Sequence, residues 1–229
     1  MSKGEFKTTR LVKRLNRFVA LIEVENKEEL AHIPNSGRMG ELLYPGAQVI
    51  VKRVDNKERK TGYDLLFAFD NDSMVAIDSR LPNGLLAEGL QKGMLPELGA
   101  YRNIKREPKW GNSRFDLLLQ EDGRKDCLVE IKSVNLAKEG VALFPDAPTL
   151  RGRRHLDELA RASEEGIRSV VFFVVMREDC NHVRPNDSLD PFFGKALRLA
   201  REKGVEVMAR VCRLKGYGVE LGSPVTVVL

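Results

Sequence analysis

The main indication of the fold comes from residues 113–134, which have the sequence SRFDLLLQEDGRKDCLVEIKSV. They contain two apolar runs, 114–119 and 127–132, separated by a charged turn around Asp122, Gly123 and Arg124. Apolar runs bounded by glycine and polar residues are typical of a β-hairpin. The stretch therefore predicts two paired strands.

Three charged side chains interrupt these apolar runs: Asp116 in the first, and Glu130 and Lys132 in the second. Such residues disfavour strands, and a charge inside an apolar strand must be paired or bind a metal. Glu130 and Lys132 are two residues apart, so they point to the same face, where Asp116 can reach them. Two close carboxylates repel each other, and a hard cation such as Mg²⁺ removes that repulsion because it prefers oxygen ligands.

The pattern D-x₁₃-E-x-K therefore predicts a metal-dependent phosphodiesterase site. Bound Mg²⁺ or Mn²⁺ would lower the pKa of a water molecule, and Lys132 would orient that water or stabilise the phosphate. The pattern resembles the PD-(D/E)XK nuclease superfamily, which implies that Asp116, Glu130 and Lys132 are catalytic and that the two carboxylates bind the metal. An ion-paired, exposed strand face is the alternative interpretation, because these residue types are common.

Two further segments carry a more specific resemblance. Residues 32–46, HIPNSGRMGELLYPG, and residues 144–155, FPDAPTLRGRRH, resemble the sugar fermentation stimulation protein A (SfsA) family, and the likeness extends from about residue 11 to the C-terminus. The resemblance implies an N-terminal OB-fold and a C-terminal nuclease-like domain. It also implies DNA binding and a suggested role in regulating sugar metabolism genes.

Composition indicates an ordinary globular protein. The chain has 229 residues, of which 42% are hydrophobic and 31% charged. A net charge of +5 favours polyanionic partners modestly. Three separated cysteines without a C-x-x-C pair argue against a zinc module and for a reducing compartment. The polar N-terminus MSKGEFKTTR lacks a signal-peptide core, and the longest apolar run, 170–176, is too short to span a membrane. We expect a cytoplasmic protein that does not contact membranes and for which a homodimer is possible.

The N-terminal part predicts a small barrel. Five strands with little helix between them suggest an OB-fold, and their expected ranges are 11–25, 29–33, 48–54, 63–69 and 74–77. The Pro82–Asn83–Gly84 turn ends this unit. We therefore expect an OB-fold-like, nucleic-acid-binding domain at residues 1–81 and a PD-(D/E)XK nuclease-like domain at residues 82–229.

The second part predicts an α/β domain with a mixed sheet, because strands and helices alternate after the hairpin. A short helix at 85–91 carries Glu88, a weaker candidate metal ligand by analogy with nuclease folds and otherwise a solvated side chain. A strand at 101–109 has a basic face formed by Arg102, Lys105, Arg106 and Lys109. Trp110 follows it and would either stack on a nucleic-acid base or simply pack in the core.

A helix at 151–165 places Arg151, Arg154 and His155 in its first turns. Basic residues there oppose the helix dipole, and a bound phosphate would reverse that cost. The alternative is a surface helix whose arginines pair with Asp157 and Glu158. Beyond it, the sequence predicts a buried strand at 169–176, a helix that begins at Pro191, and a strand at 205–214.

Two main functions remain open. The first is a metal-dependent nuclease acting on DNA, with single-stranded DNA or RNA as open alternatives. The second is a DNA-binding transcriptional regulator on a nuclease scaffold that does not cut, which basic charge and an OB-like barrel would support. In a third, weaker hypothesis the turn at Gly37 and Arg38 grips an anion such as a sugar phosphate. Arg38 is equally a candidate nucleic-acid contact.

Overall fold

The structure is a computed structural model that describes residues 5–56 and 58–229. Residues 1–4 belong to the polar N-terminus used above to predict a cytoplasmic location, and they lie outside the described residues. The chain forms two compact units. One extends to Arg80 and also includes Met176–Asp179, and the other comprises Leu81–Val175 and Cys180–Leu229. No helix among the described residues is long and apolar enough to cross a membrane.

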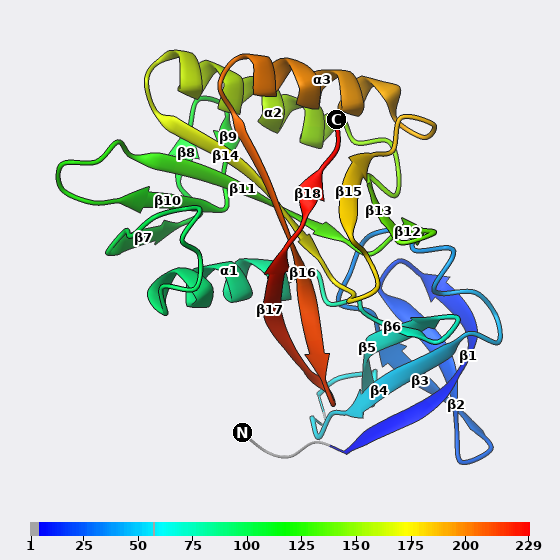
Figure 1. The fold of residues 1–229 in the computed structure, drawn as a ribbon. Coiled ribbons are helices and arrows are strands. Elements are labelled where there is room, and N and C mark those ends of the chain that lie inside the picture. The colour runs from blue at the N-terminus through cyan, green and yellow to red at the C-terminus, as the bar shows by residue number, and fades with distance from the viewer. Residues whose placement is uncertain (1–4, 57) are drawn as a thin grey trace. The chain divides into compact units, whose positions relative to one another are not determined.

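The first unit contains a closed five-stranded barrel (Figure 1). Neighbouring strands pair in the order β3-β2-β1-β4-β5, and a parallel pairing of β3 with β5 closes the circuit. Alternating apolar side chains such as Leu11, Ile22 and Val49 fill the interior with no exposed surface. The strands are β1 (Phe6–Asn16), β2 (Val19–Val24), β3 (Lys27–His32), β4 (Gln48–Arg53), β5 (Tyr63–Asp70) and β6 (Ser73–Ala76).

The predicted barrel is confirmed, but the predicted single strand at 11–25 is wrong. The chain turns after Asn16, whose side chain accepts a hydrogen bond of 2.8 Å from the Phe18 amide, and β1 and β2 pair antiparallel. The alternation of apolar residues continues through this turn, so periodicity alone did not reveal it. The strand expected at 74–77 is β6, which pairs with β5 and is not part of the closed circuit.

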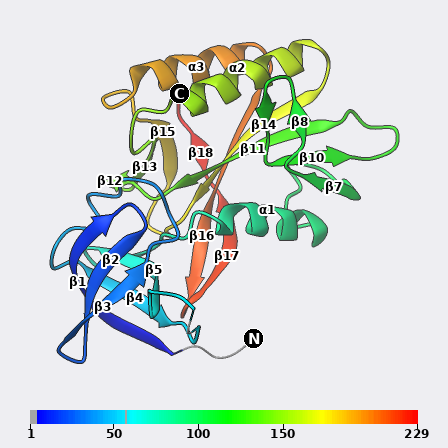
Figure 2. The same ribbon diagram turned by 180° about the vertical axis from the view of Figure 1, so that it is seen from behind.

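The second unit is built on a six-stranded sheet in the order β17-β16-β14-β11-β10-β7. The three central strands are parallel and the outer ones antiparallel, so the sheet is mixed, as predicted. Helices α2 and α3 cover one face and α1 lies on the other, as both views show (Figures 1 and 2). The strands are β7 (Asn103–Arg106), β10 (Leu117–Gln120), β11 (Cys127–Val134), β14 (Arg168–Val175), β16 (Glu206–Lys215) and β17 (Gly218–Pro224).

Helix α1 (Leu81–Gln91) begins earlier than expected, because Pro82 and Asn83 lie in its first turn rather than in a preceding loop. Helix α2 (Leu150–Glu164) is capped by the side chain of Thr149, and α3 (Pro191–Glu202) by that of Asp190. Short strands complete the unit: β8 (Lys109–Trp110) pairs with β9 (Ser113–Arg114), and a four-stranded sheet contains β12 (Ala137–Lys138), β13 (Val141–Phe144), β15 (His182–Pro185) and β18 (Thr226–Val227).

The predicted hairpin is present as β10 and β11, with one difference. The first strand does not run unbroken from 114 to 119, since residues 115–116 separate β9 from β10. The β10–β11 ladder ends at the pair Leu117 and Val129, so Asp116 lies just outside it. This interruption positions the candidate site.

Candidate active site

Asp116 occupies the point where strand β10 diverges from β11. Its Oδ2 accepts a hydrogen bond of 2.7 Å from the Ile131 amide. The side chain thus replaces a backbone acceptor that the ladder no longer supplies, since a buried amide needs a partner. Its Oδ1 accepts a bond of 2.8 Å from the Asn83 side chain of α1. Burial raises the pKa of the Asp116 carboxyl, and the nearby charge of Glu130 raises it further.

Glu130 lies on β11 and is only 4% exposed. Its Oε1 accepts a hydrogen bond of 2.7 Å from Lys132 Nζ and another from His155 Nδ1. Burial alone would raise the pKa of Glu130, but the His155 hydrogen bond and the positive charge of Lys132 outweigh it and hold the pKa below its ordinary value. Glu130 therefore stays ionised beside Asp116, a carboxyl that burial pushes toward the neutral form.

The second oxygen of Glu130, Oε2, is buried and has no hydrogen-bond partner among the described residues. An unpaired carboxylate oxygen in the interior is costly, and such atoms are usually satisfied by a bound group. Together with the two Asp116 oxygens, it offers the hard oxygen donors that Mg²⁺ and Mn²⁺ prefer. The residues therefore fit a divalent cation. No group of three His, Cys, Asp or Glu side chains that would enclose a metal exists in the described part of the chain, so water or substrate oxygens would complete the coordination.

His155 has a different role from the one predicted. It was expected to be a basic residue facing phosphate, but it is 1% exposed and its Nδ1 contacts Glu130. Arg151, one turn earlier on α2, lies with its Nε 3.4 Å from His155 Nε2. Arg151 and Arg154 are exposed. Neither forms an ion pair with any described residue, which leaves the alternative pairing with Asp157 and Glu158 unsupported.

The α1 residue that reaches the site is Asn83, which the sequence analysis did not select. Glu88, the weaker candidate ligand, is exposed and forms an ion pair with Lys92. Positions 83 and 88 are five apart and so lie on different faces of the helix. A single sequence holds no signal that distinguishes Asn83, because asparagine in a first helical turn is common.

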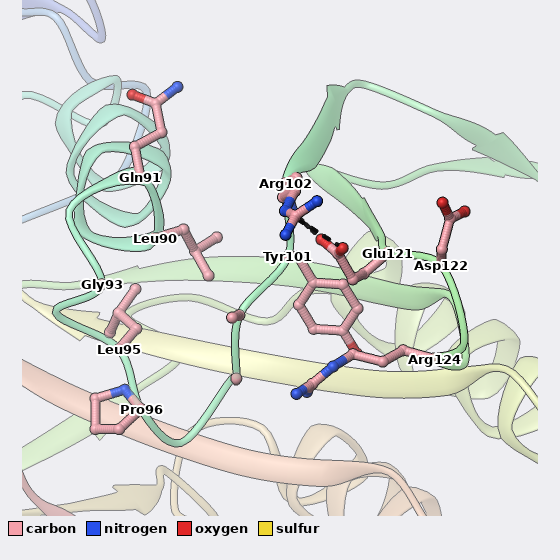
Figure 3. A pocket seen from close by; sticks show the side chains of 12 residues that line it. Leu90, Gln91, Gly93, Leu95, Pro96, Tyr101, Arg102, Glu121, Asp122 and Arg124 are labelled. Carbon is pink, nitrogen blue, oxygen red and sulfur yellow. Dashed lines mark hydrogen bonds and ion pairs between the residues drawn. The ribbon is translucent and has the colours of Figure 1, made fainter.

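The basic face of β7 is distributed along the sheet edge. Arg106 pairs opposite Leu117, at the Asp116 end of β10, and Lys105 is opposite Leu118. Arg102 lies at the far end, where it pairs with Glu121 beside a hollow of about 890 Å³ (Figure 3). Tyr101 and Arg124 line this hollow, and the Arg124 guanidinium lies over the Tyr101 ring. Arg102 is therefore separated from the site by the length of β10.

Two other predicted contacts lie elsewhere. Trp110, in β8, is half-buried and packs against the core of its unit. This packing explains the presence of a tryptophan here without a stacked base. Arg38, in the barrel unit, has an exposed side chain, and its backbone carbonyl accepts a hydrogen bond from Arg14. The neighbouring Asn35 is buried and holds the turn together through bonds of 2.7 Å to the Ile77 carbonyl and 2.8 Å from the Gly37 amide.

Comparison with known proteins identifies relatives across nearly the whole chain. Residues 12–77 match the SfsA N-terminal OB domain, and residues 80–218 match the sugar fermentation stimulation protein RE domain. A sugar fermentation stimulation protein homolog from Caldanaerobacter subterraneus subsp. tengcongensis is 43% identical over 227 residues, covering 99% of this chain and 96% of the relative. A homolog from Acetivibrio thermocellus is 46% identical over 213 residues, covering 93% and 91%.

A solved structure agrees with this result. The structure of Pyrococcus furiosus SfsA in complex with Ca²⁺ is 31% identical, has a TM-score of 0.89, and is matched over 100% of this chain and 98% of that one. The predicted resemblance and the predicted fold class, a five-stranded OB-fold-like barrel followed by a restriction-endonuclease-like α/β domain, are confirmed. The chain belongs to the sugar fermentation stimulation protein (SfsA) family.

Proposed function

We propose that this protein binds DNA and hydrolyses its phosphodiester bonds with the help of Mg²⁺ or Mn²⁺. One observation carries the proposal: the buried oxygen Oε2 of Glu130 has no partner among the described residues, and the partly buried carboxylate of Asp116 is close enough for their charges to interact. If this cluster served stability alone, every buried carboxylate oxygen would have a partner, or apolar side chains would replace the carboxylates. The Ca²⁺ bound to the SfsA protein of Pyrococcus furiosus supports a divalent cation in this family.

Each residue of the candidate site would have a distinct role. Asp116 and Glu130 would hold the cation, which supplies a water molecule of lowered pKa and charge stabilisation at the phosphate. Lys132 Nζ, 2.7 Å from Glu130 Oε1, would orient the attacking water or stabilise the charge that develops on the phosphate. His155 does not face the substrate. It orients Glu130 through its Nδ1 hydrogen bond, as partners of metal ligands commonly do.

Nucleic acid is the substrate class that the charges favour. Arg151 and Arg154 are exposed on α2, the helix that carries His155, and Arg106 lies at the Asp116 end of β7. Cations of this kind hold phosphates and make binding fall steeply with salt. The barrel belongs to the OB domain of the family, a fold that often binds single strands or oligosaccharides.

The test is cleavage of labelled single-stranded and duplex DNA, and of RNA, with Mg²⁺, Mn²⁺ or chelator. We expect the wild type to cut only with metal, and Lys132→Ala to cut at least about 100-fold more slowly, as for loss of one transition-state donor. Glu88→Gln is the matched control, because it removes an exposed carboxylate of the same unit. It should cut at the wild-type rate.

If the wild type and Lys132→Ala both bind nucleic acid in a salt-sensitive way and neither cuts it, the proposed nuclease activity is refuted. This result would instead support the alternative, a DNA-binding regulator that does not cut. Cutting by Lys132→Ala at the wild-type rate would show that any activity arises at another site or from a contaminant. Binding that is insensitive to salt would refute recognition through phosphates.

A further inference from the structure

Three large apolar side chains at the start of α2 and α3 are exposed: Leu150 and Phe192 lie in first turns, and Leu189 directly precedes Asp190, which caps α3. Leu150 is 76% exposed, Phe192 66% and Leu189 39%. We call these three residues the apolar ridge. Scattered exposed apolar residues need no explanation, but a cluster of them usually marks a binding surface. Both views show the N-terminal ends of the two helices side by side (Figures 1 and 2).

The side chain of Asp190 holds this arrangement together. Its Oδ1 caps α3 through the Phe193 amide at 3.0 Å, and its Oδ2 accepts a hydrogen bond of 2.8 Å from the Thr149 amide at the start of α2. The two first turns are therefore tied to each other. Asp190 is 2% exposed, so these two hydrogen bonds are buried. They hold the helix ends that carry the apolar ridge in fixed positions.

Positive charge is interleaved with the apolar ridge. The Arg153 guanidinium lies 5.3 Å from the centre of the Phe192 ring, and Arg153 follows Leu150 by three residues, on the same side of α2. Arg151 and Arg154 flank them, and the first turn of neither helix contains an acidic residue. An exposed aromatic ring beside an arginine suits bases that stack and phosphates that pair.

The apolar ridge is also connected to the candidate active site. Leu150 precedes Arg151, whose Nε is 3.4 Å from His155 Nε2, and His155 contacts Glu130 through its other nitrogen. A strand whose phosphate lies at Glu130 and Asp116 would therefore place its neighbouring nucleotides within reach of the start of α2.

We infer that the apolar ridge binds unpaired nucleotides next to the bond that is cut. Bases stack on Phe192 and Leu150, and the phosphates pair with Arg151 and Arg154. The inference rests on the proposed function and narrows its substrate class to nucleic acid with a single-stranded segment at the site. A duplex would satisfy the arginines equally well, but its base faces are hidden, so it has no use for an exposed aromatic ring.

The test uses the full chain and a fluorescein-labelled 20-mer, single-stranded or annealed to its complement, with binding measured by anisotropy in chelator. We expect Phe192→Ala to weaken single-strand binding about 10-fold, the effect of losing one stacked base, and duplex binding less than two-fold. Phe192→Trp should retain the wild-type affinity. Leu199→Ala is the control, because Leu199 is 46% exposed on the same helix but away from its first turn.

The outcomes separate this inference from the proposed function. Selective loss of single-strand binding supports the apolar ridge whether or not the wild type cuts with metal. Equal affinities of wild type and Phe192→Ala for the single strand overturn the inference even if cleavage is found. A change from dimer to monomer in Phe192→Ala, measured by sedimentation and with unchanged DNA binding, would overturn it in favour of a second copy of the chain.

Discussion

Replacing Asp116 with asparagine separates the contribution of the candidate site to stability from its contribution to metal binding. Both Asp116 oxygens accept hydrogen bonds, from the Ile131 amide at 2.7 Å and from Asn83 Nδ2 at 2.8 Å. An asparagine keeps one acceptor for the amide. Its NH₂ group faces Asn83, whose amide can rotate by half a turn and present its oxygen instead. Both hydrogen bonds then survive in Asp116→Asn.

The metal-free and metal-bound proteins should respond in opposite ways. Burial and the charge of Glu130 raise the pKa of Asp116, so its negative charge destabilises the folded state at neutral pH, and its removal should not lower Tm without metal. With metal at 100 times its Kd, the wild type gains about 2.7 kcal/mol. In a chain of this size that corresponds to roughly 5–10 °C in Tm. Asp116→Asn should gain less than about 1 °C, since it has lost a ligand charge.

The measurement is thermal melting in chelator and in a concentration series of Mg²⁺, Mn²⁺ and Ca²⁺. Asp72→Asn is the control, because it removes an exposed carboxylate in the turn between β5 and β6. A metal response in Asp116→Asn equal to that of the wild type would refute Asp116 as a ligand. A Tm several degrees lower in chelator would refute the account of the retained hydrogen bonds.

Three further predictions concern other parts of the structure. His155→Ala should weaken metal binding about 10- to 100-fold, because Glu130, the proposed metal ligand, loses the group that orients it; an unchanged Kd from the same melts would contradict this. Arg177 holds the pKa of Asp179 at about 2, below its ordinary value, so the pair stabilises the fold above pH 4 and this contribution is lost as the pH falls toward 2. Asp179→Asn should therefore cost about 1 kcal/mol at pH 7 in urea melts, allowing for solvent screening of the exposed Asp179 carboxylate, and the same deficit at pH 2 would count against the ion pair. Gly111→Ala should be about 1 kcal/mol more destabilising than Gly123→Ala, because both glycines have positive φ but only at Gly111 would the new Cβ lie 3.1 Å from a buried carboxylate oxygen; equal costs would show that the carboxylate moves away freely.

The placement of three candidate residues on the hairpin could be predicted because strand geometry is periodic. Glu130 and Lys132 had to share a face once β11 was recognised, and the hairpin brought Asp116 to the same end. The interruption before β10 was not predictable, since it depends on pairing of 107–108 with 115–116 and on a left-handed residue at Glu107. The periodicity of apolar residues indicates which face of a strand a side chain is on. It does not indicate where the hydrogen-bonded pairing of two strands ends.

Contacts between distant elements escaped the sequence analysis. His155 was grouped with the arginines beside it, but the helix turns it inward onto Glu130 while Arg154 stays exposed. Asn83 was assigned to a turn, whereas it opens α1 and reaches Asp116. The direction of a helical side chain depends on how the helix packs against the sheet, and that packing is a property of the tertiary fold.

The four residues Met176–Asp179 have a consequence for how this protein is made. They belong to the barrel unit, where the Met176 carbonyl accepts a hydrogen bond of 2.9 Å from Ala76 and Arg177 pairs with Asp70. A ribosome releases the five strands of the closed barrel, and β6 after them, long before it reaches these residues, because Leu81–Val175 must be synthesised first. The strand circuit can therefore close before Met176–Asp179 add their contacts to β5 and β6. A gene fragment that ends at Arg80 would encode the whole strand circuit without these contacts, so expression of the barrel unit alone should include residues 176–179, for example through a linker or a circular permutation.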